Sequence, residues 1–266
     1  MVSYQYMQPL KPTLFCVFDI ETTYWKRIAF DIAWKFVDRK GRVYGSGSYL
    51  VTDALSLDVP FFKEKLGFYF QDVNAGLILP RNMREVKEIF NAQLGDLIAK
   101  GYSVVFCAYN ARFDTDHTSK TCHTLTGTKF LEYPIRLLDI WHFWCLSAPK
   151  RYNIRTEKGN PRTSAEAVYS YEFSTPDFVE RHIAFADVEI EAEILLRILK
   201  RKKKIPFVKH PTEFRGSPWR LLLDRPLFAK QPKEFFIAPG TQFSFWEEWE
   251  PTAEQEYHAR KAKEPS

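Results

Sequence analysis

One apolar segment near the start of the chain constrains the fold most. Residues 14–20 (LFCVFDI) are rich in residues that favour β-structure, and a short apolar run of this kind is typical of a buried strand. Asp19 lies within the run and Glu21 directly after it. Residues i and i+2 of a strand point to the same side of a sheet, so we expect both carboxylates to face one place.

The pair Asp19 and Glu21 has two interpretations. Two like charges side by side repel each other unless something neutralises them, and a divalent cation is a natural neutraliser. The hard carboxylate oxygens suit Mg²⁺ or Mn²⁺. Alternatively, both carboxylates are solvated at the end of the strand and hydrogen-bonded locally. The pair alone does not decide between a metal site and two solvated acids.

The elements predicted over the first 200 residues favour an α/β fold. Strands are expected at four further segments: 28–37, 42–51, 103–108 and 135–140. The turn residues 38–41 join the first two of these into a hairpin. Helices are expected at three segments: 82–99, 164–171 and 184–200. Three strands followed by alternating helices and strands predict a mixed sheet of about five strands flanked by helices.

Composition excludes several classes of protein. With 45% hydrophobic and 27% charged residues, the 266-residue chain is neither disordered, nor collagen-like, nor a disulfide scaffold. No segment approaches the roughly 20 consecutive apolar residues that a membrane span requires. Residues 1–13 lack the apolar core of a signal peptide. We therefore expect a protein without a membrane partner.

The cysteines, at positions 16, 107, 122 and 145, indicate a reducing compartment. None belongs to a CxxC pair, and the pattern of secreted disulfide-rich proteins is absent. We therefore expect a cytoplasmic protein, with buried thiols at Cys16 and Cys107. A zinc site can be drawn from five residues whose spacing matches no common ligand template: His117, Cys122, His123, His142 and Cys145.

A second group of candidate residues follows the predicted strand 103–108. Its sequence is YNARFD, from Tyr109 to Asp114. Loops that leave the carboxyl ends of strands are where α/β proteins bind ligands. In the first turn of a following segment, Asp114 could instead serve as a cap or turn residue, because a negative charge is favourable there. The motif alone does not decide the role of Asp114.

The third candidate motif is RHIAFAD, residues 181–187. Five residues along a regular helix turn the side chain through about 500°, which leaves His182 and Asp187 about 140° out of register. They could not face one site from within one helix. They can converge if His182 precedes the helix and Asp187 lies in its first turns. The alternative for His182, which follows Glu180 and Arg181, is an ordinary surface residue.

In their order along the chain, FDIETT, YNARFD and HIAFAD resemble the motifs of the DEDDh family of 3′→5′ exonucleases. This family includes polymerase proofreading subunits and ribonuclease T-like enzymes, and it has a ribonuclease H-like fold. The resemblance covers roughly residues 13–200. The spacing of His182 and Asp187 is similar to that of the histidine branch, because the sister branch has a tyrosine at the position of Ile183.

The resemblance implies a two-metal mechanism. Four acids would hold two divalent cations, Mg²⁺ or Mn²⁺, at the scissile phosphate: Asp19, Glu21, Asp114 and Asp187. Such cations stabilise the attacking and leaving oxygens. His182 would take the proton of the attacking water, since imidazole exchanges protons near neutral pH. Neighbouring acids are expected to be solvated or structural: Asp116, Asp139, Glu189 and Glu191.

The resemblance also implies a substrate, a single-stranded 3′ end, from which nucleoside 5′-monophosphates are released. The family's residues serve both DNA and RNA, and of the two we expect DNA. Five residues are expected to contact it: Thr22, Thr23, Tyr24, Asn110 and Phe113. Base stacking on Tyr24, Trp25 or Phe113 has ordinary core packing as its alternative. The alternative function is a non-catalytic nucleic-acid- or polymerase-binding module, which the five filled catalytic positions disfavour.

Charge and proline content change near residue 200. Residues 201–266 carry 13 basic and 9 acidic residues, a net charge of +4, and half of the 16 prolines, whereas residues 1–200 have a net charge of +1. We therefore predict an exonuclease domain at 1–200 and a basic, proline- and aromatic-rich extension at 201–266. The lysine run 200–204 either contacts phosphates or is a solvated helix end. The aromatic residues of the extension are expected to dock on the domain or on a partner such as a polymerase.

Overall fold

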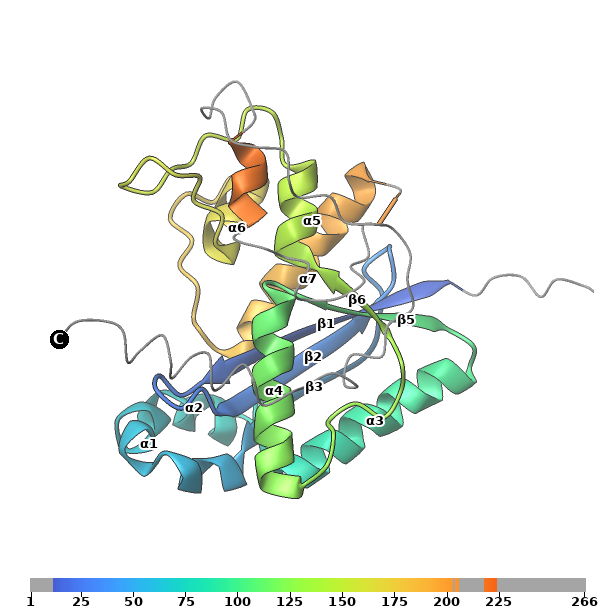
Figure 1. The fold of residues 1–266 in the computed structure, drawn as a ribbon, viewed down its shortest axis with the longest axis vertical. Helices are drawn as coiled ribbons and strands as arrows, with labels where there is room; N and C mark the ends of the chain where they lie inside the picture. Colours follow the sequence, from blue (N-terminus) through green and yellow to red (C-terminus); the bar gives the residue numbers. More distant parts are fainter. Residues whose placement is uncertain (1–11, 203, 206–217, 224–266) are drawn as a thin grey trace, which may run out of the picture.

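The computed structural model describes residues 12–202, 204–205 and 218–223, and its centre is a six-stranded sheet in the order β4-β3-β2-β1-β5-β6 (Figure 1). The strands are β1 (Thr13–Thr22), β2 (Ala29–Val37), β3 (Val43–Val51), β4 (Leu79–Arg81), β5 (Ser103–Ala108) and β6 (Arg136–Asp139). The pairs β1–β2 and β2–β3 are antiparallel, whereas β3–β4, β1–β5 and β5–β6 are parallel. The sheet is therefore mixed, as the sequence predicts.

The hairpin between β2 and β3 closes at the predicted turn. The Asp38 side chain organises it, because its Oδ1 accepts the backbone N–H groups of Lys40 at 2.7 Å and Arg42 at 3.0 Å. Gly41 takes a left-handed conformation, with φ +81°, which a residue without a Cβ adopts readily. The turn reverses the chain, so that β3 runs antiparallel to β2.

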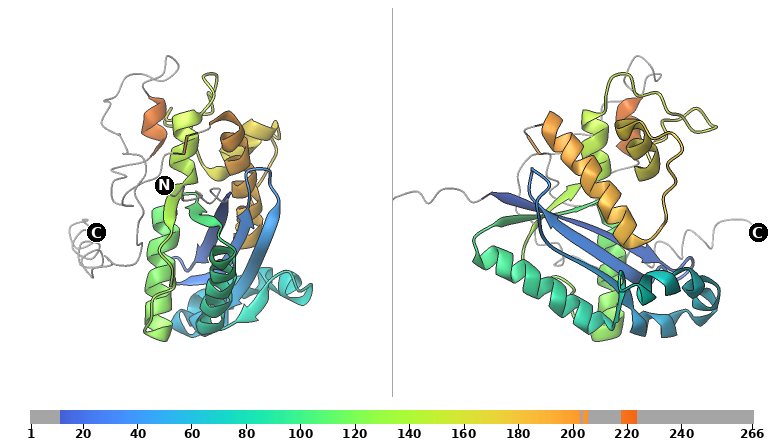
Figure 2. Two further views of the ribbon diagram at one scale, coloured as in Figure 1. Left: turned by 90° about the vertical axis from the view of Figure 1, so that its right-hand side faces the viewer. Right: turned by 180° about the vertical axis from the view of Figure 1, so that it is seen from behind.

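Helices cover both faces of the sheet, which makes three layers (Figures 1 and 2). The apolar residues of α3 (Met83–Ala99) and α4 (Ala111–Thr126) form a core with one face. Those of α5 (Ile140–Ser147), α6 (Ala165–Phe173) and α7 (Ala184–Arg201) form a second core on the other face. Four short helices lie between β3 and β4: η1 (Thr52–Leu57), α1 (Val59–Lys65), η2 (Leu66–Phe68) and α2 (Phe70–Asn74).

The side chains of β1 alternate between the two cores. Its even-numbered residues enter the core under α3 and α4: Leu14, Cys16, Phe18 and Ile20. Phe15 and Val17 enter the core under α7. Asp19 and Glu21 continue this second row and line one cleft at the end of the strand. The prediction that strand alternation brings the two acids to one side is therefore confirmed.

The predicted fold class, a ribonuclease H-like mixed sheet flanked by helices, is confirmed, and the observed sheet has six strands rather than about five. The additional strand is β4, three exposed residues at the sheet edge that pair with β3. Four α-helices of the structure are not among the predicted ones: α1, α2, α4 and α5. None of the helices in the described part of the chain is long and apolar enough to cross a membrane.

The predicted division at residue 200 falls within α7, which continues to Arg201. One short piece of the predicted extension, η4 (Pro218–Leu222), packs against α5, and Leu222 is fully buried in the core that includes α7. Six aromatic residues predicted to dock lie outside the described residues: Phe235, Phe236, Phe243, Phe245, Trp246 and Trp249. The predicted polymerase contact through this extension likewise lies outside them.

Candidate active site

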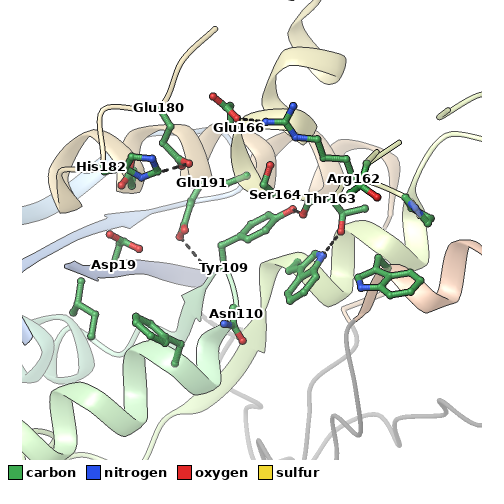
Figure 3. Close-up of a pocket in the computed structure, with 18 of the residues that line it drawn as sticks. Asp19, Tyr109, Asn110, Arg162, Thr163, Ser164, Glu166, Glu180, His182 and Glu191 are labelled. Carbon is green, nitrogen blue, oxygen red and sulfur yellow. Dashed lines mark hydrogen bonds and ion pairs between the residues drawn. The ribbon is translucent and has the colours of Figure 1, made fainter. Parts of the chain in front are cut away.

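A cleft of about 740 Å³ opens where β1 and β5 end and where α7 begins (Figure 3). Asp19 and Glu21 of β1 line it together with His182 and Asp187. β1 and β5 are parallel neighbours, so their carboxyl ends reach the same edge of the sheet. The cleft therefore lies at the position where α/β folds bind ligands.

Asp114 lies in the first turn of α4, where it is buried and does not line the cleft, although its charge helps to raise the pKa of Asp19. Asn110 follows β5 in a left-handed conformation, with φ +69°, and Ala111 begins the helix. The carboxylate of Asp139 fixes this turn, because Oδ2 accepts the N–H of Ala111 at 3.0 Å and Oδ1 accepts the N–H of His142 at 2.8 Å. Asp139 thus joins the starts of α4 and α5, which is the structural role predicted for it.

The start of α7 brings His182 to the site. His182 lies before the helix in a left-handed conformation, with φ +52°. Ile183, the N-cap residue, is aliphatic, and the first helical N–H, that of Ala184, donates to Asp31 Oδ2 of β2 at 3.0 Å. Asp187 lies in the first turn of the helix. This is the arrangement that allows the histidine and the aspartate to converge.

Glu21, His182 and Asp187 form a close group. One ligand atom from each residue lies within 4.8 Å of the others. The His182 side chain is 75% exposed, and its Nδ1 lies 4.0 Å from Glu180 Oε2. Next to it, Arg181 donates to Asp72 Oδ2 of α2 at 3.0 Å. Solvent can therefore reach His182, and the ion pair between Arg181 and Asp72 holds the neighbouring backbone against α2.

Burial and mutual repulsion raise the pKa values of the clustered acids. Burial is the main cause of the raised pKa of Glu21, which is about 9, and repulsion by the Asp187 carboxylate raises it further. Burial raises the pKa of Asp187 to about 8, and Glu180 adds to it. Burial also raises the pKa values of Asp19 and Asp114 well above their usual range. Without a counter-charge, the folded chain opposes ionisation of this cluster.

The residues present fit a divalent metal centre. Among the described residues, three of the acids have a buried carboxylate oxygen without a hydrogen-bond partner: Asp19 Oδ2, Asp114 Oδ2 and Asp187 Oδ1. Buried polar atoms are normally satisfied, so several unsatisfied oxygens in one cluster need a donor or a cation. Carboxylate oxygens are the ligands that Mg²⁺ and Mn²⁺ prefer.

Glu191 is a further buried acid of the site, and the expectation that it is only solvated or structural is incomplete. It is only 2% exposed, lines the cleft, and accepts the N–H of Tyr109 through Oε2 at 3.2 Å. Its carboxylate is the strongest of the neighbouring charges that raise the pKa of Asp19, after burial. The signal was available in the sequence, because Glu191 lies four residues after Asp187 and so on the same helix face.

The remaining acids near the motifs lie in ion pairs. Glu189 pairs with Lys35 of β2, and Asp116 pairs with Arg112 at 3.4 Å within α4. Neither residue lines the cleft. Their predicted structural or solvated roles agree with this placement.

The predicted substrate contacts divide into two groups. Asn110 and Phe113 line the cleft. Thr22 and Thr23 are buried, and Thr23 Oγ1 accepts the N–H of Ile28 at 3.2 Å. Tyr24 is 57% exposed but lies outside the cleft lining. Substrate binding by all five residues stays a prediction.

The alternative zinc ligands are not brought together. Cys122 is buried in the core under α3 and α4, whereas Cys145 is buried in the core on the opposite face of the sheet. In the described part of the chain, the group of potential ligands that does converge is Glu21, His182 and Asp187. The buried thiols of Cys16 and Cys107 are as predicted.

Comparisons with known proteins give matches among solved structures alone. No protein-family model matches the chain, and no curated protein matches its sequence. The fold is similar to that of cell-death related nuclease 4 (CRN-4), with 14% identity over 71% of this chain and 64% of that chain, and a TM-score of 0.45. It is also similar to E. coli Exonuclease I in complex with a dT13 oligonucleotide, with 14% identity, 72% and 42% coverage, and a TM-score of 0.47.

A second structure of E. coli Exonuclease I, in complex with a 5cy-dA13 oligonucleotide, matches with 15% identity and a TM-score of 0.43. That match covers 72% of this chain and 41% of the other. In all three comparisons, the matched part is less than two thirds of the other chain's length.

Proposed function

We propose that this protein is a metal-dependent 3′→5′ exonuclease. It would hydrolyse phosphodiester bonds at single-stranded 3′ ends, with DNA preferred to RNA, and release nucleoside 5′-monophosphates. The observation that carries the proposal is the convergence of acids from the first and third motifs beside an exposed histidine, at one cleft. Asp114 of the second motif is buried near enough to Asp19 to raise the pKa of that carboxyl. The polarity of the reaction rests on the resemblance of those motifs to the DEDDh family.

Four acids would hold the divalent cations, Mg²⁺ or Mn²⁺: Asp19, Glu21, Asp114 and Asp187. The unpartnered buried oxygens of three of them support this assignment. When bound, such cations stabilise the attacking and leaving oxygens of an in-line displacement. The acids themselves would fix the positions of the cations, because β1, α4 and α7 carry them toward one edge of the sheet.

His182 would accept the proton of the attacking water. Its exposure allows water to reach the ring, and Glu180 lies on the Nδ1 side. A carboxylate on that side favours the tautomer with a proton on Nδ1, which leaves Nε2 free to act as a base. The left-handed backbone at His182 is costly for a residue with a side chain, and such conformations cluster at functional sites.

The test is digestion of labelled single-stranded DNA and RNA oligomers by the full chain with Mg²⁺ or Mn²⁺. We expect stepwise shortening of a 5′-labelled oligomer from its 3′ end and loss of activity in EDTA. Loss of a general base costs on the order of 10²–10⁴-fold, so His182→Ala should lower kcat by at least about 100-fold. Asp19→Asn should be similarly inactive.

The matched control is Asp96→Asn, which removes an exposed acid of α3 that pairs with Lys100 far from the motifs. It should retain full activity. Unchanged trimming by His182→Ala or Asp19→Asn would contradict the mechanism. Binding of the oligomer without cleavage, insensitive to EDTA, would favour the non-catalytic alternative.

A further inference from the structure

The cleft is lined by aromatic residues as well as by acids, and Figure 3 labels Tyr109 among them. Tyr109 follows β5, and Trp141 lies in the first turn of α5. Their rings are nearly parallel, with an interplanar angle of 13° and centroids 6.1 Å apart. Trp219 of η4 also lines the cleft. We name Tyr109, Trp141 and Trp219 the aromatic arm.

Thr163 accepts a hydrogen bond from each of two of these aromatic residues. The Tyr109 hydroxyl donates to the backbone oxygen of Thr163 at 2.6 Å. The indole N–H of Trp141 donates to Thr163 Oγ1 at 2.7 Å. Because their polar groups are satisfied, the two rings are held in place where they line the cleft. Rings fixed in advance lose little conformational entropy when they bind a ligand.

A positively charged loop borders the aromatic arm. Residues 150–162 (KRYNIRTEKGNPR) contain five basic residues and one acid, a net charge of +4. Residues 1–200 carry +1 in total, so the rest of that part of the chain is net negative. The loop is ordered by a turn, in which Gly159 N–H donates to Thr156 O at 2.8 Å. Its last residue, Arg162, lines the cleft and donates to Glu166 at 2.6 Å.

We propose that the aromatic arm and the basic loop 150–162 bind the unpaired nucleotides that adjoin the scissile bond. This inference rests on the proposed function and deepens it. Bases would stack on Trp141 and Trp219, and phosphates would meet the basic side chains of the loop. Aromatic faces beside positive charge are the usual means of binding single-stranded nucleic acid. Stacking tolerates any base, so the subsite selects unpaired strands and not a sequence.

The first test measures binding without cleavage. The full chain is titrated with a fluorescent single-stranded oligothymidylate in EDTA, and anisotropy is recorded. Loss of one stacked base corresponds to roughly a fivefold weakening or more, so Trp141→Ala should raise Kd by at least about fivefold. Lys158→Gln should reduce the dependence of Kd on salt, because it removes a charge that neutralises a phosphate.

The matched control is Tyr102→Ala. Tyr102 is also a half-buried aromatic residue, but it lies at the other end of β5 from the aromatic arm. It precedes the amino end of the strand, whereas Tyr109 of the arm follows the carboxyl end. We expect Tyr102→Ala to bind the oligothymidylate as the wild type does. Thr163→Val keeps the backbone acceptor of Tyr109 and removes the acceptor of Trp141, so it should weaken binding less than Trp141→Ala. Circular dichroism and thermal unfolding identify any variant that fails to fold.

The second test compares two substrates in the presence of Mn²⁺. One is the oligothymidylate, and the other is the p-nitrophenyl ester of thymidine 5′-monophosphate, which has no adjoining nucleotide. Trp141→Ala should lose at least about fivefold more kcat/KM on the oligomer than on the ester. An equal loss on both substrates, or wild-type Kd in the binding test, would overturn the subsite. Weaker binding by Trp141→Ala in a protein that cleaves neither substrate would instead retain the subsite and reject the proposed exonuclease.

Discussion

Asp31 caps helix α7 from the neighbouring strand β2, since its Oδ2 accepts the backbone N–H of Ala184 at 3.0 Å. The N-cap residue of the helix, Ile183, has no polar side chain that could do so. Asp31 lies opposite Glu21 in the β1–β2 register. One strand residue therefore sets the start of the helix next to the acid with which His182 and Asp187 must converge.

Replacing Asp31 separates this capping role from its charge. An asparagine at position 31 keeps an oxygen that can accept the N–H of Ala184, whereas an alanine at position 31 has no such oxygen. We expect Asp31→Ala to have a free energy of unfolding about 1 kcal/mol lower than Asp31→Asn, the usual effect of an N-cap. Asp31→Ala should also lose more nuclease activity, because the start of α7 positions His182. Equal stability in urea titrations and equal activity of the two variants would contradict the capping role.

Buried acids in and beside the cleft make the stability of the metal-free protein depend on pH. The pKa values of Asp31, Asp187 and Glu21 rise to about 7, 8 and 9 in the folded chain, mainly through burial. In the unfolded chain such acids titrate near pH 4. The folded state then binds more protons over this interval, so the protein in EDTA should lose stability as pH rises from about 5 to 9.

Divalent cations should reverse that trend, because they stabilise the ionised carboxylates. Thermal unfolding between about pH 5 and 9, with EDTA or with Mn²⁺, measures both effects. Asp187→Asn should flatten the EDTA curve, since it removes one of the groups that must ionise. A Tm in EDTA that rises over the same pH interval would show that the cluster is not destabilising when it is charged.

Glu191 should contribute to cation binding without being equivalent to Asp187. Glu191→Gln keeps an acceptor for the Tyr109 N–H and removes one negative charge beside Asp19. Residues that support metal ligands typically contribute 10- to 100-fold in affinity, so we expect Mn²⁺ affinity to fall by about tenfold. Asp187→Asn should reduce it further. Calorimetric titration with Mn²⁺ measures both, and wild-type affinity in Glu191→Gln would exclude this role.

Gly47 of β3 is required by the packing of two aromatic residues. Trp34 and Tyr49 stack with ring centroids 5.1 Å apart, and a Cβ at position 47 would lie 2.5 Å from Trp34 and 2.6 Å from Tyr49. Overpacking of this kind costs about 1–3 kcal/mol, so Gly47→Ala should lower the free energy of unfolding by that amount. Gly67→Ala is the control, because nothing lies within 4 Å of its added methyl group. Equal stability of the two variants in urea would contradict the packing argument.

Whether a helix could be predicted depended on the chemistry of its buried face. α3 is predicted because apolar residues recur along it at helical spacing and Gly101 follows it as a stop. The structure adds a capping box at its start, between Asn82 and Glu85. α4 was missed because its buried face is largely polar or small: Ala111, Asp114, Thr115, Thr118, Thr121 and Cys122. These positions have helical spacing, but hydropathy does not mark them. α5 was missed because IWHFWCLS is apolar almost throughout and carries no helical period.

The sequence by itself determined the local features of the site. Alternation along β1 put Asp19 and Glu21 on one side, and the apolar segments 14–20 and 103–108 specified two buried strands whose ends carry candidate ligands. These features depend on residues close together in the chain, and backbone periodicity fixes them wherever a strand forms. The order of the three motifs was equally present in the sequence.

Only the tertiary structure decided which of these residues meet. Whether His182 and Asp187 converge depends on where α7 begins, and Asp31, more than 150 positions earlier, sets that start. The burial of Glu191 against Tyr109 and the fixing of Trp141 by Thr163 are likewise contacts between separate elements. Such contacts arise from packing across the sheet, which no local pattern in the sequence encodes.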